Sequence, residues 1–357
     1  MGSPRLPVVA ALLLATTTAR NSLCADYCAA ANSDASCAIC GATDVVSIHN
    51  AYERKSGRAI GDGLYAAAYL AEVWKPTVFA LRSDVAARAR AAAWTSDREG
   101  LRAAADCAAA ADCAVEFTLR EVGTYAFAVD ANVTTENGTY AYAHRVEVSA
   151  KYVRHEIRTL DEGDRERFFA ALQVLYATPG EAGRARYGSR YASAAELVRQ
   201  HLVGAASKEC DHWHDDAGVL THHLAFTLRA EQALQAIDAS LSVPYWDYTF
   251  DAYYYNATGV CSQDCLGADW EASEIFDDDW FGPMANASTG YVVASGRWAH
   301  TTIPTDARSS SPIVNAYGYL RSPWNQNPAP FLSRSRTIFG VENTATFSVE
   351  RRESFFA

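Results

Sequence analysis

The sequence predicts an α+β protein of several domains, in which an N-terminal Cys- and Ala-rich region with a small antiparallel β-module precedes a mainly helical domain. Two changes of pattern predict this class. Residues 113–153 are rich in Tyr, Phe, Val and Thr, and their apolar side chains alternate as they do in strands. From about residue 159 the apolar residues instead recur every three or four positions, which is typical of amphipathic helices.

The composition excludes several classes of protein. Of the 357 residues 49% are hydrophobic and 20% are charged, which is too apolar for an intrinsically disordered chain. The 21 glycines are too few for a collagen repeat. Acidic side chains outnumber basic ones by 42 to 31, a net charge of −11. Because phosphate groups are bound largely through Lys and Arg, we expect no nucleic acid or anionic lipid as the main partner.

Residues 1–25 have the pattern of a secretory signal peptide. A short start that ends at Arg5 is followed by an apolar or small stretch over residues 6–18, and cleavage could follow Ala19 or Ala25. The apolar stretch is shorter than the roughly 20 residues that a membrane span needs. No later segment has 18 uninterrupted apolar residues. We therefore expect a secreted protein without a transmembrane segment.

Sequons and cysteines agree with export. The candidate glycosylation sites are Asn132, Asn137, Asn256 and Asn286. The chain has nine cysteines, and in an oxidising compartment the close pairs, such as Cys107 with Cys113, are expected to form disulfides. Cys37-Ala-Ile-Cys40 could also be a redox or zinc motif, but no second CxxC follows it, which favours a disulfide.

The region between the signal peptide and the helical domain divides in two. Residues 26–112 are expected to form a Cys-containing, Ala-rich helical region, with helical stretches at 83–93 and 97–105. Residues 113–153 are expected to form the β-rich module. Its candidate strands are residues 115–119, 124–133 and 139–153. The Asn-Gly pair at 137–138 predicts a hairpin between the last two.

Three helices are expected after the β-module. The T-L-D-E pattern at 159–162 is a capping box that opens the first, and the S-A-A-E pattern at 193–196 opens the second. In the second helix His201 projects from the apolar face. The third begins near Asp215 and Asp216, whose negative charges suit a helix N-terminus.

Histidines are concentrated in this helical part. Five of the nine lie within 23 positions: His201, His212, His214, His222 and His223. Several neutral imidazoles that converge from two helices and a loop are what a copper, zinc or nickel ion requires. A histidine-rich surface or a pH-sensing patch is the alternative. We therefore predict a metal site between residues 201 and 223.

At these residues the chain resembles the tyrosinase copper-binding domain family, which includes tyrosinases, catechol oxidases and molluscan haemocyanins. In that family the first copper site, CuA, takes one histidine from a helix, one from a loop and one from the next helix, with a glutamate eight residues later. Here the resemblance places His201, His214 and His223 as the ligands, with Glu231 eight residues after the third. The string P-Y-W-D at 244–247 resembles the family's next signature.

The resemblance leaves the register of the ligands open. The spacing to His223 favours His214 as the loop ligand. However, Cys210-Asp-His212 has the form found in members whose cysteine makes a thioether to the loop ligand, which would make His212 the ligand. His222 is the alternate for the third position, because the residues around it depart from the family pattern.

Acidic side chains near the histidines are candidates to accept the second N–H of each imidazole and so orient the ring. Glu231 and Asp247 are the main candidates. Asp215 and Asp216 are further candidates, although their position favours a solvated helix start.

The resemblance also implies a fold and an activity. It implies a copper domain of four-helix-bundle type over residues 154–357, two copper ions, and oxidation of phenols or o-diphenols by O2. The second copper site, CuB, needs an HxxxH pair and a later histidine after the P-Y-W-D string, and only His300 follows. We therefore expect the CuA half alone, with the domain truncated before CuB. A haemocyanin-like oxygen carrier and a catalytically silent secreted interaction protein are the alternatives.

Overall fold

The computed structural model of the chain describes residues 46–56, 69–108, 113–135, 138–205, 213–214, 217–251, 273–303 and 329–334. Two compact units divide the chain, an N-terminal unit over Met1–Tyr152 and a C-terminal unit over Val153–Ala357. Each unit has a hydrophobic core of its own. The expected signal peptide lies outside the described residues, and no helix among them is both long and apolar enough to cross a membrane.

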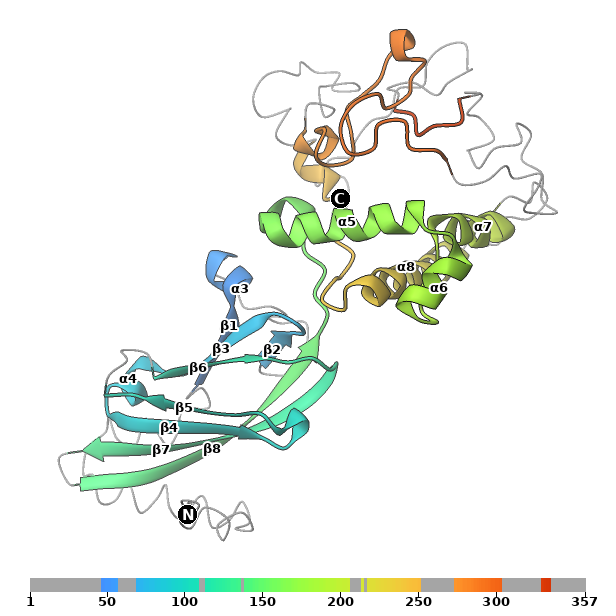
Figure 1. Cartoon of the computed structure of the whole chain (residues 1–357). Coiled ribbons are helices and arrows are strands. Elements are labelled where there is room, and N and C mark those ends of the chain that lie inside the picture. Colours follow the sequence, from blue (N-terminus) through green and yellow to red (C-terminus); the bar gives the residue numbers. More distant parts are fainter. Residues whose placement is uncertain are drawn as a thin grey trace, which may run out of the picture. The chain divides into compact units, whose positions relative to one another are not determined.

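Two sheets make up the described part of the N-terminal unit (Figure 1). The three-stranded sheet has the order β1-β3-β6 and is antiparallel, with β1 at Val46–Asn50, β3 at Pro76–Leu81 and β6 at Ala114–Thr118. The five-stranded sheet has the order β2-β8-β7-β4-β5. Its strands are β2 (Tyr69–Glu72), β4 (Ala89–Ser96), β5 (Arg102–Asp106), β7 (Gly123–Thr135) and β8 (Gly138–Lys151). β2 pairs with β8 in parallel, and the other pairs are antiparallel.

Side chains from both sheets share one core. Alternate residues of β7 are buried, among them Tyr125, Phe127 and Val129, as the period of two in a strand requires. The ring centroid of Phe79 in β3 lies 4.6 Å from that of Phe127 and 5.7 Å from that of Trp94 in β4. These contacts join the three-stranded sheet to the five-stranded sheet within the unit.

The helices expected at residues 83–93 and 97–105 are wrong. Only α4 (Ser83–Ala86) and the 3-10 turn η1 (Arg98–Gly100) are helical there, and most of the rest forms β4 and β5. Alanine has the highest helix propensity, but propensity is a weak preference that tertiary packing overrides. Here β4 is paired on both sides, with β5 and β7, and it buries Ala92 and Trp94 in the core. A further short helix, α3, spans Ala51–Ser56.

The strands expected later in this unit are present as β6, β7 and β8. β7 pairs with β8 over the whole length of β7, from Gly123 with Ala150 to Thr135 with Gly138. The predicted disulfide between Cys107 and Cys113 is also present, and it links the end of β5 to the start of β6. The remaining cysteines lie outside the described residues.

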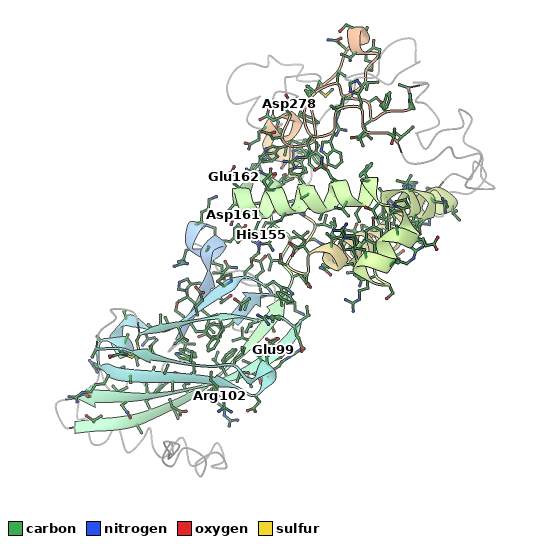
Figure 2. All side chains as sticks on the ribbon, in the orientation of Figure 1. Glu99, Arg102, His155, Asp161, Glu162 and Asp278 are labelled. Carbon is green, nitrogen blue, oxygen red and sulfur yellow. A yellow bond between two sulfur atoms is a disulfide. The ribbon has the colours of Figure 1, made fainter. Side chains whose placement is uncertain are left out.

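Four α-helices lie in the described part of the C-terminal unit: α5 (Glu162–Ala177), α6 (Gly180–Tyr187), α7 (Ala194–Ala205) and α8 (Gly218–Ile237). Asp161, rather than the expected Thr159, caps α5, because its side chain accepts from the backbone N–H of Asp164 at 2.8 Å (Figure 2). The capping box of α7 is as predicted. The backbone N–H of Ser193 donates to Glu196 at 2.9 Å, and that of Glu196 donates to Ser193 Oγ at 3.3 Å.

The expected fold class, an α+β protein whose C-terminal domain is mainly helical and of four-helix-bundle type, is wrong. The described residues form a mixed α/β structure with two substantial sheets. In the C-terminal unit α6 has only 8 residues, against 20 in α8. The core around Phe169 and Leu234 is completed by Ile275, Trp280 and Trp298, which come from 3-10 turns and irregular chain. Part of this core therefore comes from residues outside the four helices.

Candidate metal centre

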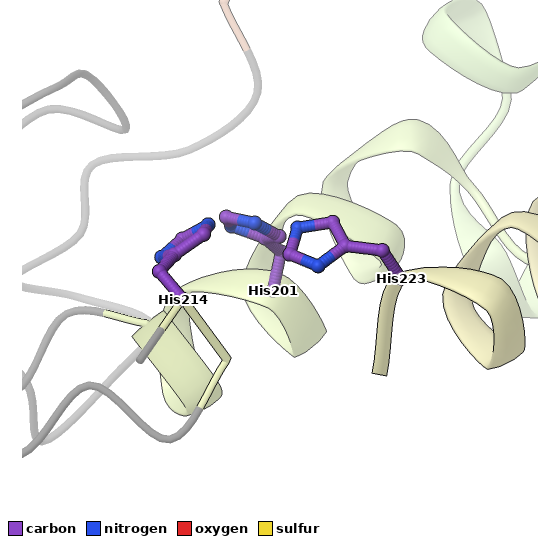
Figure 3. A group of neighbouring side chains, drawn as sticks. All are labelled: His201, His214 and His223. Atoms are coloured by element: carbon purple, nitrogen blue, oxygen red, sulfur yellow. The ribbon is translucent and has the colours of Figure 1, made fainter. Parts of the chain in front are cut away.

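Three histidines from separate elements meet in the C-terminal unit (Figure 3). His201 belongs to α7, His214 precedes α8, and His223 lies in the second turn of α8. One ligand nitrogen from each ring lies within 4.8 Å of the other two. The ring centroids are 5.1 to 5.5 Å apart. We call this group the histidine triad.

Local structure explains why α7 presents His201. The capping box fixes the start of α7, and Glu196 also binds Arg184 of α6, with 2.7 Å between Nη1 and Oε1. Leu197 is buried in the core one turn before His201. Because residues i and i+4 share a helix face, His201 projects along the side of α7 that faces the rest of the unit. His201 is half-buried there.

A backbone hydrogen bond sets the chemistry of His223. Its Nδ1 lies 2.8 Å from the carbonyl oxygen of Val219, one turn earlier in α8. A carbonyl oxygen can only accept, so Nδ1 carries a proton, and in the neutral ring the lone pair is then on Nε2. Histidines that bind metals usually donate their other N–H to such an acceptor. His223 is therefore prepared to bind a metal through Nε2.

His222 makes the same kind of bond, from Nδ1 to the carbonyl oxygen of Gly218 at 3.0 Å. Its ring, however, stacks on Trp213, with centroids 5.4 Å apart and planes at 21°. The triad includes His223 and does not include His222. The structure thus brings together the three histidines preferred from the sequence and places the alternate His222 beside them.

Glu231 holds α8 in place through contacts away from the triad. Its buried carboxylate accepts from Arg154 Nε at 2.8 Å and Nη2 at 3.2 Å, and from the backbone N–H of Val243 at 2.9 Å. The hydrogen bond to Glu231 raises the pKa of the Arg154 guanidinium above its ordinary value. These contacts differ from the expected role of orienting an imidazole. They tie the second half of α8 to Arg154, which precedes α5, and to Val243, which follows α8.

The segment that carries the P-Y-W-D string is also anchored by charge. Arg158 donates to Asp251 at 2.8 Å and to the carbonyl oxygen of Asp247 at 2.9 Å. The indole N–H of Trp246 donates to the second oxygen of Asp251 at 2.7 Å. The side chain of Asp247 accepts from the backbone N–H of Thr249 at 3.1 Å. Asp247 thus closes its own turn, which again differs from the expected imidazole contact.

Several predicted site residues lie outside the described part of the chain. These are His212, Cys210, Asp215, Asp216, Asn137 and Asn256. His212 as an alternate ligand and Cys210 as a thioether partner therefore stay predictions. His300 is described and lies apart from the triad in sequence and contacts, with its ring 5.6 Å from that of Phe331.

Two aromatic residues at the centre were not singled out from the sequence. The Trp213 ring lies 5.2 Å from that of His201, and the Phe226 ring lies 5.7 Å from it. The available signal was position: Trp213 stands between two histidines, and Phe226 follows His223 by three residues on the same helix.

The donor set of the triad fits a transition metal. Three imidazole nitrogens suit copper, zinc or nickel, whereas magnesium and calcium prefer oxygen ligands. We compared the positions of histidine, cysteine and acidic side chains among the described residues. The histidine triad is the group in which three of them lie close enough to share one ion. The arrangement can therefore hold a metal.

Comparisons with known proteins agree with this site. Residues 189–353 match the family model described as the common central domain of tyrosinase. The chain is 26% identical over 202 residues to a tyrosinase of Streptomyces antibioticus, covering 53% of the chain and 68% of that protein. It is 26% identical over 187 residues to a tyrosinase of Streptomyces glaucescens, covering 48% of the chain and 62% of that protein.

A third relative is tyrosinase-like protein 2 of Margaritifera margaritifera, which is 28% identical over 206 residues. That match covers 57% of the chain and 37% of the relative, so the chain spans only part of the proteins it is similar to. No solved structure matches the chain. The histidine triad lies within the matched residues, so the site is in the part of the chain that is similar to the common central domain of tyrosinase.

Proposed function

We propose that the chain binds copper through His201, His214 and His223 and is part of an oxidoreductase that oxidises phenols or o-diphenols with O2. The observation that carries this proposal is the convergence of three imidazole nitrogens within 4.8 Å, inside the region that matches the tyrosinase central domain. Two of the relatives are named tyrosinases.

The nature of the donors supports copper. Neutral imidazole binds both Cu(I) and Cu(II), and three such ligands leave a coordination position open. Copper, when bound here, supplies the electron transfer and O2 chemistry that side chains lack. The chain's own residues bind and orient the ion and leave a path to it. His201 and His223 are half-buried and His214 is exposed, so a small phenol can approach from the side of His214.

We propose one copper ion for the triad, at the position of the CuA site. The family is expected to use two ions, and the described residues provide one group of three ligands.

Copper content tests the ligand assignment. We expect about one copper per chain in the purified protein and a large loss in His223→Ala. His222→Ala is the matched control, because His222 is adjacent and makes the same backbone bond but lies outside the triad. Equal copper in the wild type and in His223→Ala would contradict the assignment. Loss in His222→Ala alone would move the third ligand to His222.

Catechol oxidation tests the reaction. We expect a full-length version with both copper ions bound to convert a catechol to its quinone, followed by absorbance, and we expect His223→Ala to lose this activity. Reversible O2 binding without turnover would instead favour an oxygen carrier.

We also propose that the protein is exported and carries N-glycans at Asn132 and Asn286. Asn132 is exposed on β7 between two buried neighbours, and Asn286 is exposed at the start of the 3-10 turn η5 (Ala287–Thr289). Expression in a eukaryotic secretory host should give a mature N-terminus after Ala19 or Ala25. Glycosidase treatment should lower the mass, by less in Asn132→Gln and Asn286→Gln. An unprocessed N-terminus and an unchanged mass would contradict export.

A further inference from the structure

Trp213 packs against the histidine triad from the loop side. Its ring centroid lies 5.2 Å from that of His201 and 5.8 Å from that of His223, both edge-on. It also lies 5.4 Å from His222, in a stacked arrangement, and 5.5 Å from Phe226. The indole therefore contacts α7 through one ring and α8 through three, next to the backbone of His214.

Gly204 in α7 provides the space for this indole. A Cβ atom at Gly204 would overlap Nε1 and Cδ1 of Trp213, so any side chain at position 204 would displace the indole. Glycine within a helix is less favourable than alanine by about 1 kcal/mol. At this position the absence of a side chain is what allows α7 and Trp213 to make contact.

The contact between Trp213 and Gly204 matters because the next residue, His214, belongs to the triad. His214 follows Trp213 directly, and it is the exposed member of the triad. Unlike His201 and His223, it is not carried by a helix. An indole held between two helices fixes the backbone of the next residue, and residues around a metal site are effective when they hold each ligand in place before the metal binds.

We propose that Trp213 is a positioning residue: its indole, seated against Gly204, holds His214 beside His201 and His223. This inference rests on the proposed copper site. It adds that the loop ligand is placed by an aromatic side chain and a glycine that bind no metal themselves.

The test measures the Cu(II) dissociation constant of the full chain by competition with a chelator, and the number of bound imidazoles by pulsed EPR. We expect Trp213→Ala and Gly204→Ala to weaken Cu(II) binding about 10- to 100-fold, the range typical of residues that support metal ligands. Both variants should show two bound imidazoles where the wild type shows three. Trp213→Phe, which keeps an aromatic ring, should restore the third.

Two controls separate positioning from a general loss of structure. Gly163→Ala places the same substitution in α5, where the nearest atom to the new Cβ is 3.5 Å away, and it should leave copper binding unchanged. The double variant Trp213→Ala/His214→Ala should bind copper no more weakly than His214→Ala alone, because both changes remove the same ligand. Additive losses would show that Trp213 acts elsewhere and would overturn the inference.

A measurement without metal tests the contact between Trp213 and Gly204. The difference in fluorescence between the wild type and Trp213→Phe isolates the emission of this indole, and Gly204→Ala should make that emission more accessible to acrylamide. If the Trp213 emission were equally accessible to acrylamide in the wild type and in Gly204→Ala, the proposed contact with Gly204 would be wrong. Copper binding that is the same in the wild type and Trp213→Ala overturns this inference alone, whereas a wild type that binds no copper overturns the proposed function and the inference with it.

Discussion

Neighbouring histidines with the same backbone contact have different surroundings in α8. His222 and His223 each bond the carbonyl oxygen one turn earlier, but successive residues point about 100° apart around a helix. His223 is thereby directed toward His201 and His214, whereas His222 is directed onto the face of Trp213. Helical geometry, rather than histidine density, distinguishes the two.

The candidate site could be predicted from sequence where spacing along helices decides it. The spacing between His214, His223 and Glu231 favoured His214 and His223 as ligands, and the structure brings these two together with His201. The contacts of Glu231 with Arg154 and Val243 could not be predicted, because they join positions far apart in the chain. The role of Trp213 depends on the space at Gly204, which is also a tertiary property.

Tyr125 in the N-terminal unit provides a prediction about pH. Burial, together with a hydrogen bond from its hydroxyl to Glu99, raises its pKa from 10.0 to about 12. Because the folded pKa is above the unfolded one, the stabilisation is complete below about pH 10 and is lost as the pH rises toward 12. We expect the free energy of unfolding of this unit to fall more steeply between these values in the wild type than in Tyr125→Phe.

Denaturant unfolding at several alkaline pH values measures this difference. Parallel pH profiles for the two proteins would contradict the assignment of the raised pKa to Tyr125. Tyr142, whose pKa burial also raises to about 12, is present in both proteins and contributes equally to each profile.

At the scale of elements, α8 shows what a hydrophobic pattern can and cannot predict. The recurrence of leucines indicated a helix, and the helix spans Gly218–Ile237. Its buried contacts, however, come from Glu231, Ala233 and Leu234 near its end. Leu220 and Leu224 are 67% and 66% exposed. The pattern predicts the periodicity of an element but does not say which part of it meets the core.

Because one end of α8 is buried and the other is exposed, we expect Leu→Ala substitutions at the two ends to change the free energy of unfolding by different amounts. Leu234→Ala should lower the free energy of unfolding by about 2–5 kcal/mol, because the side chain is 2% exposed and its removal leaves a cavity. Leu220→Ala should change it by less than about 0.5 kcal/mol. Chemical denaturation of the two variants measures both values. Similar losses in both would show that Leu220 is covered in solution.

The β4 and β5 strands show that residue propensity can predict the wrong secondary structure. Residues 89–96 and 102–106 are mostly alanine, which by propensity predicts helix. Strand pairing with β7 and the burial of Trp94 decide the outcome, and neither can be deduced from a local window. The strands with Val, Phe and Tyr at alternate positions, such as β7, were predictable because composition and tertiary structure agree there.

At the scale of the whole molecule, the two units have separate hydrophobic cores, and we expect a substitution in one core to leave the other core intact. Phe79 is fully buried in the N-terminal core, whereas the triad belongs to the C-terminal unit. Phe79→Ala should destabilise the N-terminal unit by about 3–5 kcal/mol and leave the Cu(II) dissociation constant unchanged. Denaturation and copper titration of the same preparation test this. A weakened copper affinity would contradict the independence of the two cores.

A crystal structure of the copper-loaded full chain, with anomalous differences measured at the copper edge, would locate the metal and its ligands. We expect one anomalous peak within bonding distance of a nitrogen from each of His201, His214 and His223, with Nε2 as the ligand atom of His223. A peak on other residues, or no peak at the triad in a protein that is otherwise folded, would contradict it.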